Sequence, residues 1–152
     1  MFTQNRISNV FNKAPEILFN DRSKIVIMSD CHRGDGSYAD NFARNQNLFF
    51  AALTQYYHHK YTYIELGDGD ELWEHVKISK ALEVYDNVFW LLSKFHQDSR
   101  LYMMYGNHDI VKAKNGSFKS QLVHCDGPDE QCYPIFPNIQ FYEGLMLRHT
   151  EQ

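Results

Sequence analysis

The stretch KIVIMSDCHRGDG, residues 24–36, decides the fold. Its four apolar residues, Ile25 to Met28, include β-branched side chains and are typical of a short buried strand. Asp30 and His32 follow it, separated by a single residue. Just past the end of a strand, two side chains with this spacing can reach one common ligand. The stretch therefore predicts a buried strand that carries a candidate site at its carboxyl end.

Two further strands are predicted over residues 61–68 and 100–107, and each leads into polar residues. The first ends in GD, and the second runs into GNHD. The polar side chains at these two ends are Asp68, Asn107, His108 and Asp109. In open parallel sheets, ligands bind outside the carboxyl ends of the strands. We therefore expect these side chains to converge with Asp30 and His32 at one edge of a sheet.

Apolar residues recur at helical spacing between the strands, over residues 37–60 and 78–97. Parallel strands need crossovers of a dozen or more residues, and both intervals are long enough. The order strand, helix, strand, helix, strand predicts an α/β fold with a largely parallel sheet covered by helices.

The rest of the chain gives weaker signals. Residues 1–23 read as a lead-in with one short helix or strand at most, and residues 117–124 as a short helix. Residues 125–138 read as a loop. Residues 138–149 carry two β-favouring runs around Glu-Gly, which predict an antiparallel hairpin.

Length and composition narrow the class of protein. The 152 residues fit a single domain, and 43% hydrophobic content argues against disorder. The net charge of −4 gives no basic surface for a stable nucleic-acid complex. No apolar run is long enough to span a membrane, and residues 1–20 lack the layout of a signal peptide. The odd number of cysteines, Cys31, Cys125 and Cys132, predicts reduced thiols in a cytoplasmic protein.

The residue types at the strand ends point to metal chemistry. Carboxylate oxygen and imidazole nitrogen suit Zn, Fe or Mn. Several carboxylates at one edge would repel one another unless a cation neutralised them. The sequence therefore predicts a metal site, with Asp30, His32, Asp68 and Asn107 as its candidate ligands.

The three motifs resemble those of the calcineurin-like metallophosphoesterases, whose pattern is D-x-H, then G-D-x-x-[DE], then G-N-H-[DE]. Here they read DCH at residues 30–32, GDGDE at 67–71 and GNHD at 106–109, and the resemblance spans residues 24–110. The longer phrases look most like bacterial members of the family. The resemblance implies a layered α/β/β/α fold for the single domain of residues 1–152.

The resemblance also implies a hydrolase of phosphoester bonds, whether in monoesters, diesters or pyrophosphates. Its two divalent metal ions, Mn²⁺ first and Fe or Zn as alternatives, would share a bridging hydroxide. By this resemblance, Asp30 and His32 would bind the first metal, Asp68 would bridge both metals, and Asn107 would bind the second. His108 would donate a proton to the leaving group, and Asp109 would orient His108. The substrate would be a phosphorylated small molecule or a nucleotide-type compound, and the oligomeric state stays open.

The late histidine motifs of that family have no counterpart here. The only histidine after residue 124 is His149, which is followed by threonine where the family has glycine. Either it is a late metal ligand or it lies on the surface of the hairpin. We expect the chain to lack the C-terminal part of the domain. The alternative function is therefore a catalytically inert fragment, or a scaffold that retains the metallophosphoesterase fold.

Other polar and aromatic residues near the motifs can also be interpreted, and Arg33 and Glu71 each have two interpretations. Arg33 either meets the substrate phosphate or is a solvated loop residue. Glu71 either orients a metal ligand or stabilises a helix N-terminus. Trp73 follows the predicted bridging residue closely and could form an apolar wall beside the metals. His58 and His59 fall at the opposite edge of the sheet, so we expect them on the surface.

Overall fold

The computed structural model describes residues 2–73, 77–114, 116–125 and 131–150. The helices are α1 (Phe2–Lys13), α2 (Gln46–His58), α3 (Ile78–Val84), α4 (Asp86–Gln97), the 3₁₀ helix η1 (Ile110–Lys114) and α5 (Gly116–Lys119). The strands are β1 (Glu16–Phe19), β2 (Ile25–Met28), β3 (Thr62–Leu66), β4 (Leu101–Met104), β5 (Val123–Cys125), β6 (Cys132–Pro134), β7 (Phe141–Tyr142) and β8 (Met146–His149). Among the described residues, no helix is long and apolar enough to cross a membrane.

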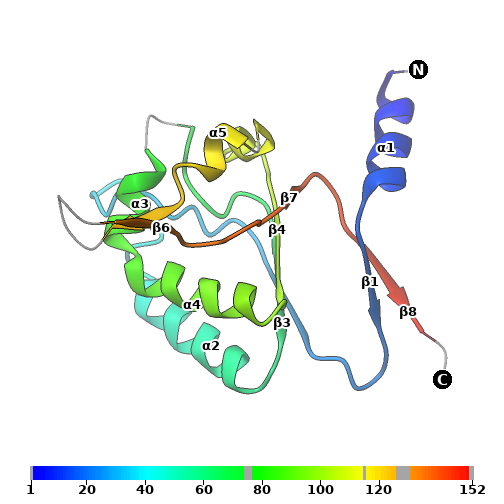
Figure 1. Cartoon of the computed structure of the whole chain (residues 1–152), viewed down its shortest axis with the longest axis horizontal. Helices are drawn as coiled ribbons and strands as arrows, with labels where there is room; N and C mark the ends of the chain where they lie inside the picture. The colour runs from blue at the N-terminus through cyan, green and yellow to red at the C-terminus, as the bar shows by residue number, and fades with distance from the viewer. Residues whose placement is uncertain (1, 74–76, 115, 126–130, 151–152) are drawn as a thin grey trace.

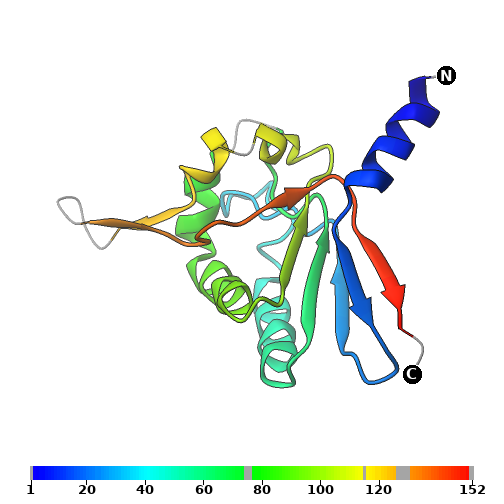
Figure 2. The same ribbon diagram turned by 45° about the vertical axis from the view of Figure 1, so that its right-hand side comes forward.

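A parallel sheet of four strands forms the centre of the molecule, in the order β2-β3-β4-β7 (Figures 1 and 2). Val26 lies opposite Tyr63 in the first pair of strands, and Ile64 lies opposite Tyr102 in the second. The three strands predicted from the sequence are thus confirmed, together with their parallel direction. The prediction that the first of them is buried is wrong, because β2 is only partly buried and Ile27 is exposed. Their carboxyl ends lie at one edge of the sheet.

Helices α2 and α4 cover one face of this sheet (Figure 2). Leu53 of α2, Phe95 of α4 and Tyr63 of β3 are completely buried between them. The ring of Phe95 lies 5.9 Å from that of Tyr63 and 5.2 Å from that of Tyr57. These contacts bury the apolar stripes that predicted the two helices, and they leave the carboxyl ends of the strands free for polar side chains.

Both predicted helices differ from the observed ones at their ends. The first begins only at Gln46, because the Asp40 carboxylate accepts hydrogen bonds from the backbone N–H groups of Gly34, Gly36 and Phe42 and so fixes a loop there. The second is divided at Tyr85 into α3 and α4. The Tyr85 hydroxyl donates to Asp40, which ties this break to the loop.

The predicted C-terminal hairpin is wrong. Strand β7 pairs in parallel with β4, whereas β8 pairs in parallel with β1 in a separate two-stranded sheet. Phe141 is buried in the core against Phe118, and this contact keeps β7 in the main sheet. Glu143 then accepts hydrogen bonds from Arg6 of α1 where the chain crosses to β1. The start of the chain also holds more structure than expected, because α1 and β1 both form there.

The layers agree with the predicted α/β class. Helices α2 and α4 lie on one side of the main sheet, and the β1–β8 sheet lies on the other side (Figures 1 and 2). In the part of the chain that the structure describes, no second helical layer covers β1 and β8 to complete an α/β/β/α arrangement.

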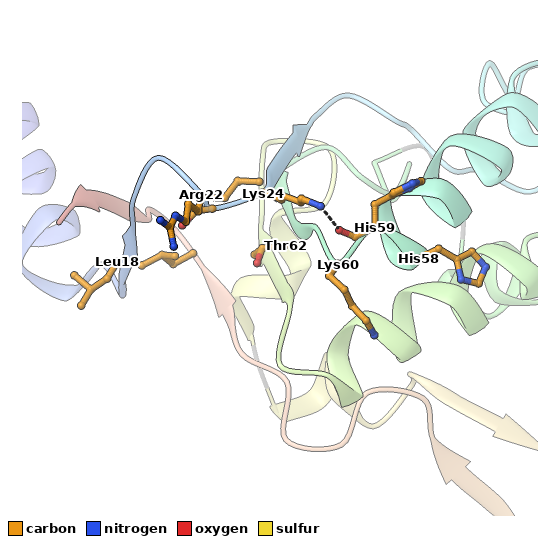
Figure 3. Close-up of a pocket in the computed structure, with 10 residues that line it drawn as sticks. Leu18, Arg22, Lys24, His58, His59, Lys60 and Thr62 are labelled. Carbon is orange, nitrogen blue, oxygen red and sulfur yellow. Dashed lines mark hydrogen bonds between the residues drawn. The ribbon is translucent and has the colours of Figure 1, made fainter. Parts of the chain in front are cut away.

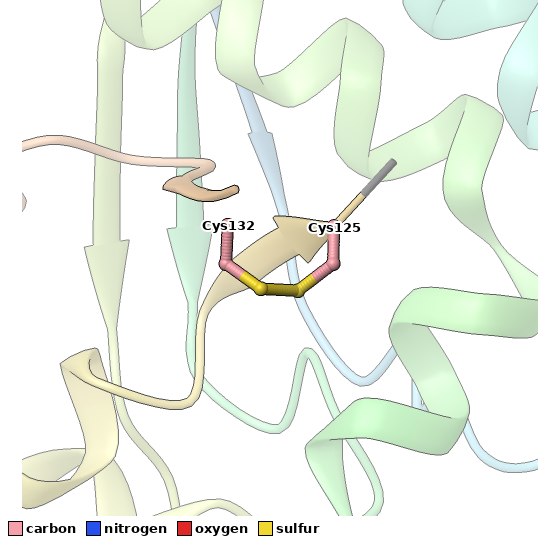
Figure 4. Close-up of a disulfide and its surroundings, with 2 residues drawn as sticks. All are labelled: Cys125 and Cys132. Carbon is pink, nitrogen blue, oxygen red and sulfur yellow. A yellow bond between two sulfur atoms is a disulfide. The ribbon is translucent and has the colours of Figure 1, made fainter. Parts of the chain in front are cut away.

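The cysteine prediction is wrong for two of the three residues. Strands β5 and β6 form an antiparallel pair in which Cys125 faces Cys132, and the two side chains form a disulfide (Figure 4). This pair replaces part of the loop predicted over 125–138, and the expected helix over 117–124 is reduced to α5. Cys31 is a free thiol, and burial raises its pKa to about 11. It is therefore protonated at neutral pH, unlike the thiolate that binds metals.

Candidate metal centre

The loops after β2 and β3 continue the parallel pairing past the ends of the strands. The backbone N–H of His32 donates to the carbonyl of Asp68 at 3.0 Å, and that of Asp30 donates to the carbonyl of Gly67 at 3.3 Å. Arg33 donates to the carbonyl of Gly69 at 3.0 Å in the same way. The two loops are therefore held side by side, which brings the motif DCH next to the motif GDGDE.

Three of the predicted ligands have left-handed backbone conformations. The φ angles are +54° at Asp30, +51° at His32 and +50° at Asp68. A residue with a Cβ costs roughly 1–2 kcal/mol in this region. Strained residues of this kind cluster at functional sites, where the surrounding structure enforces them. Here the strain coincides with the predicted metal ligands.

Asp30, His32 and Asp68 form the first of two clusters with the chemistry of a metal site. Their candidate ligand atoms all lie within 4.8 Å of one another. Asp30 Oδ1 lies 3.8 Å from His32 Nε2, and the Ser29 hydroxyl donates to Asp30 Oδ2 at 2.6 Å. The backbone N–H of His108 donates to Asp68 Oδ1 at 2.8 Å. The structure therefore brings together three of the side chains that were expected to converge.

The second cluster joins His32, Glu71 and His108, again within 4.8 Å. Glu71 Oε2 lies 3.0 Å from His32 Nδ1 and 2.8 Å from His108 Nδ1. Partial burial opposes ionisation of Glu71, but hydrogen bonds from the two imidazoles and a backbone N–H outweigh it, so its pKa lies below the usual value. The carboxylate therefore stays charged and can keep a proton on Nδ1 of each ring.

This arrangement decides between the two readings of Glu71. Helix α3 begins at Ile78, so Glu71 is not the N-terminal acid of that helix. A carboxylate that bonds to Nδ1 of a histidine is the usual partner that orients a metal-ligating imidazole through its other nitrogen. Glu71 has this position toward both His32 and His108.

Asp109 has a different place from the one expected. Its carboxylate is completely buried and accepts hydrogen bonds from the backbone N–H groups of Gly106 at 2.7 Å and Gly69 at 3.1 Å. Lys112 Nζ lies 2.6 Å from the same carboxylate. The expectation that Asp109 orients His108 is therefore wrong, and the contact with that imidazole belongs to Glu71.

Both readings of Arg33 are also wrong. The side chain is completely buried, so it is neither a solvated loop residue nor open to a substrate phosphate. Its guanidinium group binds Glu65 through two hydrogen bonds of 2.8 and 2.9 Å, and Asp70 through a third of 2.8 Å. Burial opposes ionisation of Asp70, but the charges of Arg33 and Lys112 outweigh it and lower its pKa to about 2.

Asn107 and Trp73 lie at the edges of the clusters. Asn107 is exposed and follows Gly106. Gly106 passes so close to Asp68 that a Cβ atom placed on this glycine would lie only 2.3 Å from Asp68 Oδ1. The backbone before Asn107 thus passes directly beside the Asp68 carboxylate. The ring of Trp73 lies 5.0 Å from that of His108, edge to face, and is largely exposed.

A cavity of about 300 Å³ adjoins both clusters. It is lined by His32, Gly34, Asp35, Ser37, Ala39, Asp40, Asn41, Glu71 and His108. Its outer wall is the loop that the buried Asp40 carboxylate holds in place. A small substrate that reached the clusters would therefore contact residues 34–41.

A larger cavity of about 590 Å³ lies at the opposite ends of the strands (Figure 3). Lys24 and Thr62 line it at the start of β2 and β3, together with His58 and His59, which are exposed as expected. The described residues that line this cavity include no carboxylate. It therefore lacks the ligand set found at the carboxyl ends.

His149 lies on the surface, away from both clusters. It belongs to β8 and pairs through Nε2 with Asp21 Oδ1 at 3.0 Å, while its ring packs against Phe19 of β1. The structure thus agrees with a surface residue, although β8 is not part of the predicted hairpin.

No family model, no curated protein and no solved structure matches this chain. A family assignment therefore rests on the three sequence motifs and on the geometry of the two clusters.

Proposed function

We propose that this protein is a metal-dependent hydrolase of phosphoester bonds, of the calcineurin-like metallophosphoesterase type. One observation carries the proposal: Asp30, His32 and Asp68 form a cluster that could hold a metal ion at the carboxyl ends of adjacent parallel strands, and Glu71 and His108 adjoin it through His32. The α/β class and the parallel sheet agree with that family's fold, and the layered α/β/β/α arrangement is part of the proposal.

The donor set fits divalent metals such as Mn²⁺, Fe or Zn. It combines carboxylate oxygens with imidazole nitrogens and contains no thiolate. Asp30, His32 and Asp68 would hold one ion, and Asp68 with Asn107 would hold the second. When bound, two such ions neutralise phosphoryl oxygens and lower the pKa of water.

His108 is the candidate general acid. In this proposal the His108 ring donates its Nδ1–H to Glu71. When the ring is protonated on both nitrogens, Nε2 can give its proton to the departing oxygen of a phosphoester. Glu71 stabilises the positive charge of the protonated ring. Trp73 packs against the same ring and limits its movement.

The second candidate is a scaffold without activity. His149, the candidate late ligand within residues 1–152, pairs with Asp21 on the surface instead of joining the clusters. A metal site with few histidine ligands would bind its ions too weakly for turnover.

The substrate class, a phosphorylated small molecule or a nucleotide, and the cytoplasmic location stay predictions. The disulfide would be unusual in a reducing compartment.

Removal and return of metal distinguish the two candidates. We expect the purified protein to hydrolyse 4-nitrophenyl phosphate or its bis ester when supplied with Mn²⁺. Chelation by EDTA should abolish the activity, and excess Mn²⁺ should restore it. Tight Mn²⁺ binding without hydrolysis of either ester would support the scaffold instead.

A further inference from the structure

A set of charged side chains is buried directly beneath the two metal-ligating clusters. We call it the buried ion network; its members are Arg33, Glu65, Asp70, Asp109 and Lys112. All of them have relative exposures of 0 or 1%. Taking charges out of water is expensive, so such a group is retained only where each member is well paired.

The pairing is continuous. Lys112 Nζ lies 2.6 Å from Asp109 Oδ2 and 2.8 Å from Asp70 Oδ2. Asp70 Oδ1 accepts a hydrogen bond from Arg33, which also binds Glu65 through both terminal nitrogens. The Tyr63 hydroxyl donates to the same Glu65 carboxylate at 3.1 Å. The network therefore links strand β3 with the segments that follow β2, β3 and β4.

Each of these segments carries a candidate metal ligand next to a network member. Arg33 follows His32, and Asp70 lies two residues after Asp68. Asp109 lies two residues after Asn107 and accepts hydrogen bonds from the backbone N–H groups of Gly69 and Gly106. The network therefore joins the backbone segments that carry the candidate ligands.

We propose that the buried ion network holds the metal-ligating loops in place before any metal binds, with Lys112 as the positioning residue that joins two of them. This inference rests on the metal centre of the proposed function. Lys112 is buried and is not placed to touch metal or substrate. It acts through the two aspartates that it pairs, one from the loop after β3 and one from the loop after β4.

Lys112→Met tests the proposal because the loss of charge and the loss of positioning would change the Mn²⁺ affinity in opposite directions. Removing a buried positive charge makes the surroundings more negative, which by itself tightens the binding of a cation. Loss of positioning weakens it, and changes in groups that orient metal ligands typically cost 10–100-fold in affinity. We expect Mn²⁺ to bind the variant about 10–100-fold more weakly, as measured by calorimetry. Equal or tighter binding by the folded variant would overturn the proposal.

Two control variants separate positioning from charge and from stability. Lys80→Met removes an exposed positive charge that pairs with Glu83 on the surface, and it should leave the Mn²⁺ affinity unchanged. Leu92→Ala removes a buried side chain of α4 and destabilises the core. If it lowers the Mn²⁺ affinity as much as Lys112→Met does, a general loss of stability explains both, and the positioning role is wrong.

Hydrogen exchange of backbone amides in the unmodified protein gives a second test, which does not depend on whether a variant folds. In metal-free protein with EDTA, the amide protons of Gly69 and Gly106 should exchange slowly, because Asp109 already accepts them. Fast exchange that slows only after Mn²⁺ is added would mean that the metal orders the loops, and would overturn the inference. Failure of the parent protein to bind Mn²⁺ would instead overturn the proposed function, whatever the exchange rates.

Discussion

Asp68→Asn should abolish metal binding while leaving the fold intact. Asp68 belongs to the Asp30–His32–Asp68 cluster and is the residue proposed to serve both ions. An amide has no negative charge to offer a cation, and loss of a ligand should cost more than the 10–100-fold typical of groups that only orient ligands. We therefore expect the affinity for Mn²⁺ to fall by more than about 100-fold in calorimetric titrations.

Stability should change much less than affinity in this variant. The amide oxygen of asparagine can still accept the hydrogen bond from the His108 backbone N–H. Loss of the charge also relieves repulsion with Asp30 in the metal-free protein. Asp35→Asn is the matched control, since Asp35 lines the adjoining cavity but belongs to neither cluster. Binding of two ions by Asp68→Asn with the parent's affinity would show that Asp68 is not the bridge.

His108→Ala should slow hydrolysis without loss of metal. A general acid contributes about 10²–10⁴-fold in rate, so kcat should fall by about that factor for phenyl phosphate. The loss should be smaller for 4-nitrophenyl phosphate, because nitrophenolate departs without a proton. Glu71→Gln should show the same dependence on the leaving group to a lesser degree, because it weakens the partner of His108 Nδ1. His58→Ala, an exposed histidine at the other edge of the sheet, is the control.

Two results would change the role of His108. An equal loss of rate for both esters would indicate that it positions the phosphate rather than donating a proton. Loss of bound Mn²⁺ from the variant would make His108 a ligand, which the cluster of His32, Glu71 and His108 also permits.

The strands and the convergence of Asp30, His32 and Asp68 were predictable from the sequence because both depend on local patterns. Ile25 to Met28 form a strand, and Asp30 and His32 follow it within the same few residues. Parallel pairing then carries each strand end to the same edge of the sheet. The local strand patterns and the parallel direction of the strands were therefore enough to predict that Asp68 lies beside Asp30 and His32.

The features that were missed depend on pairs far apart in the sequence. Glu16 pairs with Met146 in the β1–β8 sheet, and a pairing over such a separation leaves no periodic signal. Lys112 reads as an ordinary polar residue after GNHD, although it is buried among carboxylates. The sequence does not decide the role of Glu71, because only the loop geometry places its carboxylate against both imidazoles.

Anomalous diffraction can locate manganese at the carboxyl ends of the strands. Crystals of the protein grown with excess Mn²⁺, measured on the two sides of the manganese absorption edge, should show a peak within coordination distance of Asp30, His32 and Asp68. A second peak between Asp68 and Asn107 is expected for a dinuclear centre. Diffraction that shows ordered side chains at these residues and no anomalous peak among them would contradict the account.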